Sequence, residues 1–297
     1  MKRSIVVLVV VALAGAACSS SGSSKAASTG APTTSGPSTT STTSTTSAAA
    51  PALHAGDGCV ALGSSIASGY GLAVQSTSCG RSSVDYGQLV AARYQLKLTD
   101  VSCGAAQTKH VLDTAQGANP PQIQALTAGT KLVTVSVGGN DIGYNATAVG
   151  CSDPATTCTA PATFDADVAT LRTSLVTLIQ RLRAAAPKAT IVFVTYPREF
   201  PATGNCAALS MSDAEVAVVR HIGDVLEQTF VDVVKPTGVA FVDPYVAPGD
   251  HTGCAPADQA WAAGNKPADG FSYHPTALGH RVMAQMIEQA LGSVPAG

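Results

Sequence analysis

Short apolar runs alternate with longer segments whose apolar residues recur at helical spacing, from about residue 56 to the end of the chain. The apolar runs predict strands at residues 58–63, 96–101, 131–137, 190–195 and 239–242. Helices are predicted at residues 86–94, 120–125, 168–182, 212–235 and 274–291, and loops at 144–161 and 243–273. This alternation predicts an α/β domain with a mostly parallel sheet that helices cover on both faces.

The first residues have the pattern of an export signal. Basic residues in Met1-Lys2-Arg3 precede an apolar run over 5–17, which is too short to span a bilayer comfortably, and Cys18 follows. The segment 15–18 resembles a bacterial lipobox, although Gly15 stands where leucine is usual. Cleavage after a small-x-small pattern at 14–16 is the alternative. We favour an exported protein with a lipidated Cys18, held at the cell envelope, over a freely secreted one.

Residues 19–55 are almost entirely Ser, Thr, Ala, Gly and Pro. Such a segment has little apolar surface to bury, and it is expected to be a disordered tether between the signal region and a folded domain over 56–297. The net charge is −2 and no basic patch is present, which argues against nucleic acid as a partner. We expect a monomer attached to the membrane through its lipid.

Seven cysteines follow Cys18, without a C-x-x-C pair or a histidine cluster, which argues against zinc. In an oxidising compartment they are expected to form disulfides with one thiol left over. Cys59 lies inside the predicted first strand and is the natural free thiol. The other six allow many pairings, which the residues alone leave open.

Small-residue turns follow three of the predicted strands. Ser65 lies on a glycine-rich turn after the first strand, Gly104 follows the second, and Gly138-Gly139-Asn140-Asp141 follows the third. His274-Pro275 opens the last helix, so these segments can meet at one end of the sheet. Acyl transfer needs a nucleophile, a base and hydrogen-bond donors to the oxyanion. The candidates are the Ser65 hydroxyl, the His274 imidazole, the N–H groups of Ser65 and Gly104, and the Asn140 amide. Asp141 is expected to be structural.

Together these blocks resemble the GDSL/SGNH hydrolase superfamily, in which G-D-S-x-x-x-G, a later Gly, G-x-N-D and D-x-x-H-P follow one another. The matching residues are Gly63, Ser65, Gly69, Gly104, Gly138, Asn140, Asp141, His274 and Pro275. The resemblance implies a three-layer α/β/α sandwich with a flavodoxin-like central sheet. It also implies an esterase or lipase that hydrolyses carboxylic esters, small or lipid, with no metal or cofactor.

The chain looks most like the secreted bacterial branch of this superfamily with three disulfides. That resemblance implies the pairs Cys79–Cys103, Cys151–Cys158 and Cys206–Cys254. It leaves Cys59 free, in agreement with the separate argument from its predicted strand.

Two residues depart from the superfamily pattern. Ser64 stands where the first block has Asp, and Phe271 stands three residues before His274, where the last block has Asp. Some relatives in this branch orient the imidazole with a main-chain carbonyl. We therefore expect a Ser–His dyad held by the Phe271 carbonyl, with Asp269 as the alternative.

Two questions stay open at this point. Trp261, Tyr70 and Tyr273 either line an acyl or alcohol pocket or simply pack in the core. The rival function is a non-catalytic envelope lipoprotein that binds glycans or lipids on a decayed hydrolase scaffold. Its support is Ser64 and the missing acid. Lipases, phospholipases, thioesterases and carbohydrate deacetylases share this machinery, so the sequence does not choose among them.

Overall fold

The computed structural model describes residues 52–72, 75 and 78–292, which belong to a compact unit spanning Ala48–Gly297. The predicted export signal, Cys18 and most of the predicted linker lie outside the described residues. Within the described part of the chain, no helix has the length and apolar character needed to cross a membrane.

Five strands form the sheet, and every neighbouring pair is parallel. The strands are β1 (Gly58–Gly63), β2 (Lys97–Asp100), β3 (Thr130–Ser136), β4 (Thr190–Val194) and β5 (Ala240–Val242), in the spatial order β2-β1-β3-β4-β5. All five were predicted, each to within one residue at either end. Their apolar side chains are buried because helices cover both faces of the sheet.

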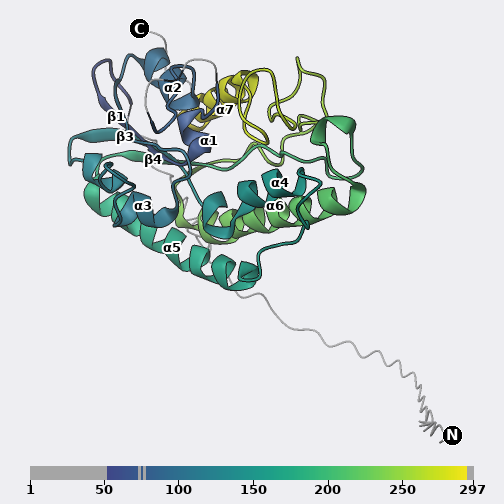
Figure 1. The fold of residues 1–297 in the computed structure, drawn as a ribbon. Helices are drawn as coiled ribbons and strands as arrows, with labels where there is room; N and C mark the ends of the chain where they lie inside the picture. The colour runs from purple at the N-terminus through teal and green to yellow at the C-terminus, as the bar shows by residue number, and fades with distance from the viewer. Residues whose placement is uncertain (1–51, 73–74, 76–77, 293–297) are drawn as a thin grey trace, which may run out of the picture. The chain divides into compact units, whose positions relative to one another are not determined.

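Helices lie on the two faces and complete the three layers, as Figure 1 shows. One layer holds α1 (Ser65–Ser68), α2 (Tyr86–Tyr94) and α7 (Ala277–Ala290). The other holds α3 (Thr108–Leu112), α4 (Tyr144–Cys151), α5 (Phe164–Ala185) and α6 (Asp213–Val233). Four short 3-10 helices are η1 (Gln122–Ala125), η2 (Gly139–Ile142), η3 (Ala207–Leu209) and η4 (Lys235–Thr237). This architecture confirms the predicted fold class.

The long helices form where their apolar periodicity predicts them. The side chains of α5 that face the sheet are fully buried: Leu171, Leu175, Leu178, Ile179 and Leu182. At the start of α6, the Ser212 hydroxyl accepts from the Glu215 N–H, and the Glu215 carboxylate accepts from the Ser212 N–H at 2.7 Å. This reciprocal pair confirms the predicted capping box, which satisfies two N–H groups that the helix itself leaves unpaired.

The prediction of a loop over 144–161 was wrong for its first half, where Tyr144–Cys151 forms α4. The segment contains Asn, Thr and Gly, which have weak helix propensity, and it lacks a clear amphipathic pattern. Tertiary contacts form the helix instead, because Tyr144, Ala148 and Cys151 are buried against the core. Residues 108–112, where no helix was predicted, form α3.

All three disulfides implied by the resemblance are present, and Cys59 is free and buried. Cys79–Cys103 joins the segment before α2 to the turn after β2, and Cys151–Cys158 closes the turn after α4. Cys206–Cys254 links two loops that are 48 residues apart in the sequence. The bridges restrict segments that connect the strands. The sheet itself is stabilised by its parallel strand pairing and its buried core.

The strand order reverses at β1, which lies between β2 and β3. In open α/β sheets, the crevice at the carboxyl ends of the strands beside such a reversal is where ligands bind. The turns after β1 and β3 meet there, since Gly63 pairs with Ser136 in the ladder and the Ser64 N–H donates to the Ser136 carbonyl at 2.9 Å. The topology therefore brings the Ser65 and Asn140 segments together.

Candidate active site

The turn that presents Ser65 requires glycine at the end of β1. Gly63 has φ +130°, and a Cβ at this position would lie 2.1 Å from the Ser136 carbonyl oxygen. Ser65 then begins the short helix α1, which ends at Gly69 in the left-handed conformation. These two glycines allow the chain to leave the strand and place the serine at the carboxyl edge of the sheet.

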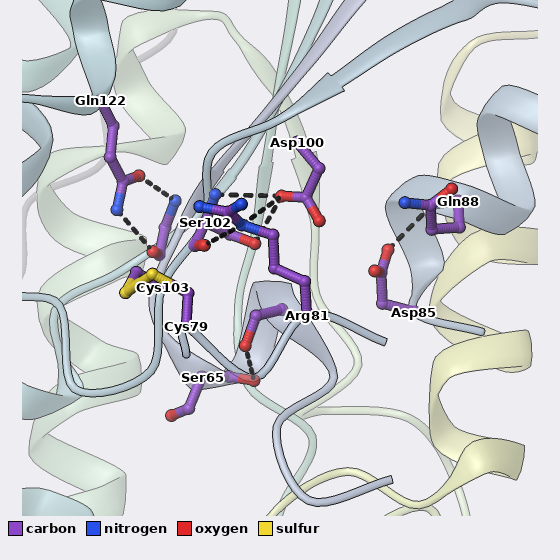
Figure 2. Close-up of polar contacts among 11 residues, drawn as sticks. Ser65, Cys79, Arg81, Asp85, Gln88, Asp100, Ser102, Cys103 and Gln122 are labelled. Carbon is purple, nitrogen blue, oxygen red and sulfur yellow. Dashed lines mark hydrogen bonds and ion pairs between the residues drawn. A yellow bond between two sulfur atoms is a disulfide. The ribbon is translucent and has the colours of Figure 1, made fainter. Parts of the chain in front are cut away.

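Gln122 supports the same turn where β1 extends past the end of β2. Its side-chain oxygen accepts from the Gly63 N–H at 2.7 Å, and its nitrogen donates to the Gly63 carbonyl at 3.0 Å. Figure 2 shows this amide beside the Cys79–Cys103 disulfide. The amide oxygen thus satisfies the Gly63 N–H, while the Gly63 carbonyl accepts both from Gln122 and from the Cys103 N–H at 3.0 Å.

The structure brings Ser65 and His274 together. The Ser65 hydroxyl oxygen lies 2.8 Å from Nε2 of His274, and both side chains are buried, Ser65 with 8% and His274 with 3% exposure. The two residues are 209 positions apart in the sequence. A neutral imidazole in this position can accept the serine proton as the oxygen attacks an electrophile.

The other ring nitrogen contacts a backbone carbonyl, although not the predicted one. Nδ1 of His274 lies 3.0 Å from the carbonyl oxygen of Ser272, so the prediction of the Phe271 carbonyl is corrected by one residue. Tyr273, between Ser272 and His274, has φ 56°, and this turn directs the Ser272 carbonyl to the ring. Asp269 is exposed and has no hydrogen bond to His274 among the described residues.

Phe271 contributes its ring instead of its carbonyl. Its ring lies edge-on to the His274 imidazole with 5.1 Å between centroids, and the centroid of the Tyr70 ring lies 5.3 Å from that of Phe271.

Burial lowers the pKa of His274 from 6.5 to about 4, because the imidazolium is poorly solvated, while the backbone contacts to Ser272 and Tyr273 oppose that shift. The ring is consequently neutral, and able to act as a base, across the physiological range.

Two buried carboxyl groups near this end of β1 belong to neighbouring elements rather than to the dyad (Figure 2). Asp85 caps α2 by accepting from the Gln88 N–H at 2.8 Å, and burial raises its pKa to about 8. Asp100 accepts from the Ser102 N–H at 3.0 Å and from its hydroxyl at 2.6 Å. In the described structure neither carboxyl is hydrogen-bonded to His274, so neither supplies the missing acid.

Asn145, on α4, is a site residue that the sequence analysis missed. Its amide nitrogen lies 3.3 Å from the carbonyl oxygens of Ser272 and Tyr273 and 3.2 Å from Nδ1 of His274. When Nδ1 carries the proton and donates it to Ser272, the Asn145 amide donates to the two carbonyls. Asn145 therefore holds the peptide that orients the imidazole. The sequence analysis did not find Asn145 because it expected a loop over 144–161 and because no motif covers this position.

The three predicted oxyanion donors differ in availability. The Ser65 N–H has no hydrogen bond within the described part of the chain. The Asn140 amide donates one hydrogen to the Ala106 carbonyl at 3.0 Å, and its second hydrogen has no acceptor among the described residues. Gly104 donates its N–H to the Cys79 carbonyl at 2.9 Å, so the structure does not support a free donor there. The Cys79–Cys103 disulfide explains this contact, because it holds Cys79 beside Gly104.

The departure at Ser64 has a structural counterpart in Tyr196. Ser64 is fully buried, with its oxygen 3.3 Å from the Tyr196 hydroxyl and 3.4 Å from the Ser136 carbonyl. The Tyr196 hydroxyl accepts from the Gly139 N–H at 3.0 Å. Two neutral hydroxyls thus connect the Ser65 turn to the Asn140 turn, where the superfamily pattern has a carboxylate. Ser64 is buried in this chain of contacts, whereas the Ser65 hydroxyl lies within hydrogen-bond distance of His274.

The remaining residues singled out from the sequence fall into two groups. Asp141 is structural, as expected, because its carboxylate accepts from the N–H and hydroxyl of Thr108 at the start of α3. Tyr273 packs in the core and donates its hydroxyl to the Leu209 carbonyl at 2.7 Å. Tyr70 lies beside the dyad, with its ring centroid 6.4 Å from that of His274. Trp261 lines a separate cavity.

A serine on a strand-to-helix turn, hydrogen-bonded to a histidine at the carboxyl edge of a parallel sheet, is an arrangement that α/β serine hydrolases use. The chain belongs to the GDSL-like Lipase/Acylhydrolase family, whose model matches residues 61–282. It is 29% identical over 237 residues to "Lipase" of Streptomyces rimosus, covering 77% of this chain and 84% of the relative. It is 30% identical over 232 residues to "Lipase 1" of Streptomyces coelicolor, covering 76% and 83%.

Solved structures agree with this membership. The phospholipase A1 of Streptomyces albidoflavus NA297 superposes with a TM-score of 0.63 at 27% identity, covering 80% of this chain and all (100%) of that one. The extracellular lipase of Streptomyces rimosus gives a TM-score of 0.63 at 27% identity, covering 78% and 99%. Family, relatives and fold together make this protein a carboxylic ester hydrolase.

The pH dependence of catalysis should reflect the buried imidazole. Because the base must be neutral and burial lowers the pKa of His274 to about 4, kcat/KM should fall as the pH decreases through about 4. The profile is measured with p-nitrophenyl acetate, at a wavelength where both forms of the phenol absorb, while circular dichroism reports folding. An acid limb centred near the ordinary histidine pKa of 6.5 would contradict this assignment.

Asn145→Ala should reduce kcat by about 10-fold with little change in KM, because the peptide that holds the imidazole loses two hydrogen bonds. Val149→Ala, on the exposed side of the same helix, is the matched control. Asn145→Asp puts a carboxylate near Nδ1, so it should raise the His274 pKa and shift the acid limb upward. If neither variant changes the pH profile or kcat, Asn145 is merely structural.

Proposed function

We propose that this protein is an exported serine esterase that uses Ser65 as nucleophile and His274 as general base. The observation that carries the proposal is the 2.8 Å contact between the Ser65 hydroxyl and Nε2 of His274. The low pKa of the ring and the acceptor at Nδ1 both support a tautomer with a free lone pair on Nε2. Family membership gives the reaction class, and this contact gives the residues.

The proposed reaction has two stages. The Ser65 oxygen bonds to the ester carbonyl carbon while its proton moves to Nε2 of His274, and the carbonyl oxygen becomes an oxyanion. The oxyanion then collapses, the alcohol leaves with the proton from Nε2, and an acyl-serine remains. Water adds to this acyl group as His274 accepts its proton. Collapse of the second oxyanion then breaks the bond to the Ser65 oxygen, which takes the proton back from Nε2, and the acid leaves.

We propose an oxyanion hole made by the Ser65 N–H and the second hydrogen of the Asn140 amide. The Ser65 N–H has no acceptor in the described structure. The Asn140 amide uses its other hydrogen on the Ala106 carbonyl, and the turn that carries Asn140 is joined to Ser64 through the Tyr196 hydroxyl. Each donor in such a site contributes roughly 10²–10³-fold to kcat. Gly104 stays a prediction as the third donor, and it would have to give up its bond to the Cys79 carbonyl.

The lack of a carboxylate limits the proposed base. A carbonyl at Nδ1 fixes the tautomer, but it stabilises the imidazolium less than a carboxylate would, and the low pKa of His274 reflects a weak base. We therefore propose that esters with good leaving groups, or substrates that bind through additional contacts, are turned over best. Phe271, which is 37% exposed, and Tyr70 offer an apolar surface beside the dyad for the acyl or alcohol part of such an ester.

We propose further that the protein is exported and lipid-anchored through Cys18. The basic and apolar start of the chain supports export. The three disulfides support an oxidising compartment, and one structural relative is an extracellular lipase. The rival hypothesis of a non-catalytic binding lipoprotein loses weight because Ser65 and His274 have kept a reactive geometry.

A fluorophosphonate probe should label the wild-type protein and fail to label Ser65→Ala. On p-nitrophenyl acetate, Ser65→Ala and His274→Ala should each lose about 10⁴-fold or more in kcat, and Asn140→Ala about 10²-fold. Ser64→Ala is the matched control, since it removes the neighbouring hydroxyl and should leave the labelled serine in place. A wild-type protein that is folded but neither labelled nor active would favour the non-catalytic hypothesis.

Cys18→Ala should release the protein from the membrane. Wild-type protein expressed with its full leader should enter the detergent phase of a Triton X-114 extract and incorporate an alkyne fatty acid. The variant should lose the label and leave the detergent phase. Unlabelled wild-type protein in the culture medium would instead indicate ordinary signal cleavage without lipidation.

A further inference from the structure

A cavity of about 540 Å³ lies at the carboxyl ends of β4 and β5, and neither Ser65 nor His274 lines it. The loop after β4 contributes Arg198 to its lining. The long loop between β5 and α7 contributes Tyr245, Asp250, His251 and Trp261. The reaction proposed above uses none of these side chains.

Two stacked pairs of side chains line the cavity. The His251 and Trp261 rings are stacked with centroids 3.9 Å apart and an angle of 1° between their planes. In the second pair, the Arg198 guanidinium lies 4.0 Å from the centre of the Tyr245 ring. Asp224 holds that pair, since it accepts from Arg198 at 3.1 Å and from the Tyr245 hydroxyl at 2.7 Å. Both surfaces are therefore already ordered before a ligand arrives.

Hydrogen-bonding groups lie beside these surfaces. Nδ1 of His251 lies 2.9 Å from the Gln259 carbonyl, which leaves Nε2 without a hydrogen bond in the part of the chain that the structure describes. One oxygen of Asp250 accepts from the Thr252 N–H and hydroxyl, and the other has no such partner within the described residues. Thr203, at the rim, is exposed. A ligand thus meets aromatic faces next to separate polar atoms.

The charges of the lining residues exclude several ligand classes. Arg198 is the one lysine or arginine in the lining, and its pairing with Asp224 together with the Asp250 carboxylate disfavours an anion such as phosphate. A cation would meet the guanidinium that already covers the Tyr245 ring. A hydrocarbon chain would remove water from Asp250 and His251 without offering them hydrogen bonds in return. A neutral, hydroxyl-rich ring satisfies both kinds of surface.

We propose that this cavity binds a neutral saccharide, with a sugar ring on the Trp261–His251 platform and its hydroxyls on His251, Asp250 and Arg198. The platform is tied to the catalytic histidine through the backbone. The Trp261 carbonyl accepts from the Thr276 N–H at 2.8 Å, and the Ala263 N–H donates to the His274 carbonyl at 2.8 Å. The saccharide is either part of the ester substrate, which rests on the proposed function, or a separate glycan that anchors the enzyme.

Trp261 is the single tryptophan of the chain, so its emission reports on this cavity alone. Ser65→Ala protein is titrated with cellotetraose, xylotetraose and chitotetraose. At least one should change the emission saturably, with half-saturation below about 10 mM. Sodium phosphate and octanoate serve as the anionic and apolar comparisons. Absence of a saturable change with all three saccharides, or saturation by octanoate or phosphate alone, overturns the proposal.

Substitutions at Trp261 and His251 test whether the saccharide binds in this cavity. Trp261→Ala should weaken saccharide binding at least about 10-fold by calorimetry, and Trp261→Phe should restore part of it, because the apolar ring returns. His251→Ala retains the tryptophan and should weaken binding seen by fluorescence, which keeps the test valid if Trp261→Ala fails to fold. Val176→Ala, exposed on α5, is the control and should bind as wild type. Unchanged binding in both cavity variants overturns the site.

Kinetics separate the two sources of the saccharide. If the sugar belongs to the substrate, Trp261→Phe and His251→Ala should raise KM for an acetylated xylooligosaccharide at least about 5-fold more than KM for p-nitrophenyl acetate. If it is a separate glycan, the two KM values change in parallel while binding is lost. Both outcomes support the cavity assignment. Binding is measured on the Ser65→Ala protein, so failure of the proposed catalysis and failure of saccharide binding are distinguishable.

Discussion

The contact between the Ser65 hydroxyl and Nε2 of His274 is the interaction for which the rest of the domain is arranged. It joins residues at opposite ends of the folded region, and it forms because strand order reverses at β1. Two unusual backbone positions complete it. Gly63 turns the chain out of β1 toward Ser65, and Tyr273 turns the last loop so that the ring faces the serine. Both turns are held by buried neighbours, so the contact needs little rearrangement before it can act.

Neutral dipoles perform the tasks that charged groups perform in the superfamily pattern. The Ser272 carbonyl and the Asn145 amide orient the imidazole, and the hydroxyls of Ser64 and Tyr196 connect the two turns of the site. A buried site without a carboxylate avoids the desolvation cost of a fixed charge, but it also leaves the imidazolium less stabilised. Burial of the ring lowers the pKa of His274, and the backbone carbonyl contacts only partly oppose that shift. These neutral contacts explain how the fold keeps the Ser65 hydroxyl against His274 despite both departures.

The loop before His274 links the dyad to the aromatic cavity. It is stapled by Cys206–Cys254, and its strand-like bridge between Ala262 and Pro275 holds Trp261 near the histidine backbone. Gly279 in α7 lacks a side chain where the Trp261 carbonyl approaches, since a Cβ there would lie 2.1 Å from that oxygen. The backbone around Trp261 is therefore joined by hydrogen bonds to the backbone around His274, so a ligand bound at Trp261 would have a defined position relative to the histidine.

The strands, the long helices, the parallel sheet, the family blocks and the free Cys59 could all be predicted from the sequence, because each depends on local periodicity or on a short motif. The sequence also indicated Ser65, His274 and Asn140. Tertiary structure alone decided which carbonyl meets Nδ1, that Asn145 on the unpredicted helix α4 supports it, and that Gly104 is engaged by Cys79. It also decided that Tyr196 partners Ser64 and that Trp261 lines a cavity. These features are contacts between residues far apart in the chain, and their geometry depends on loop conformations that no local pattern encodes.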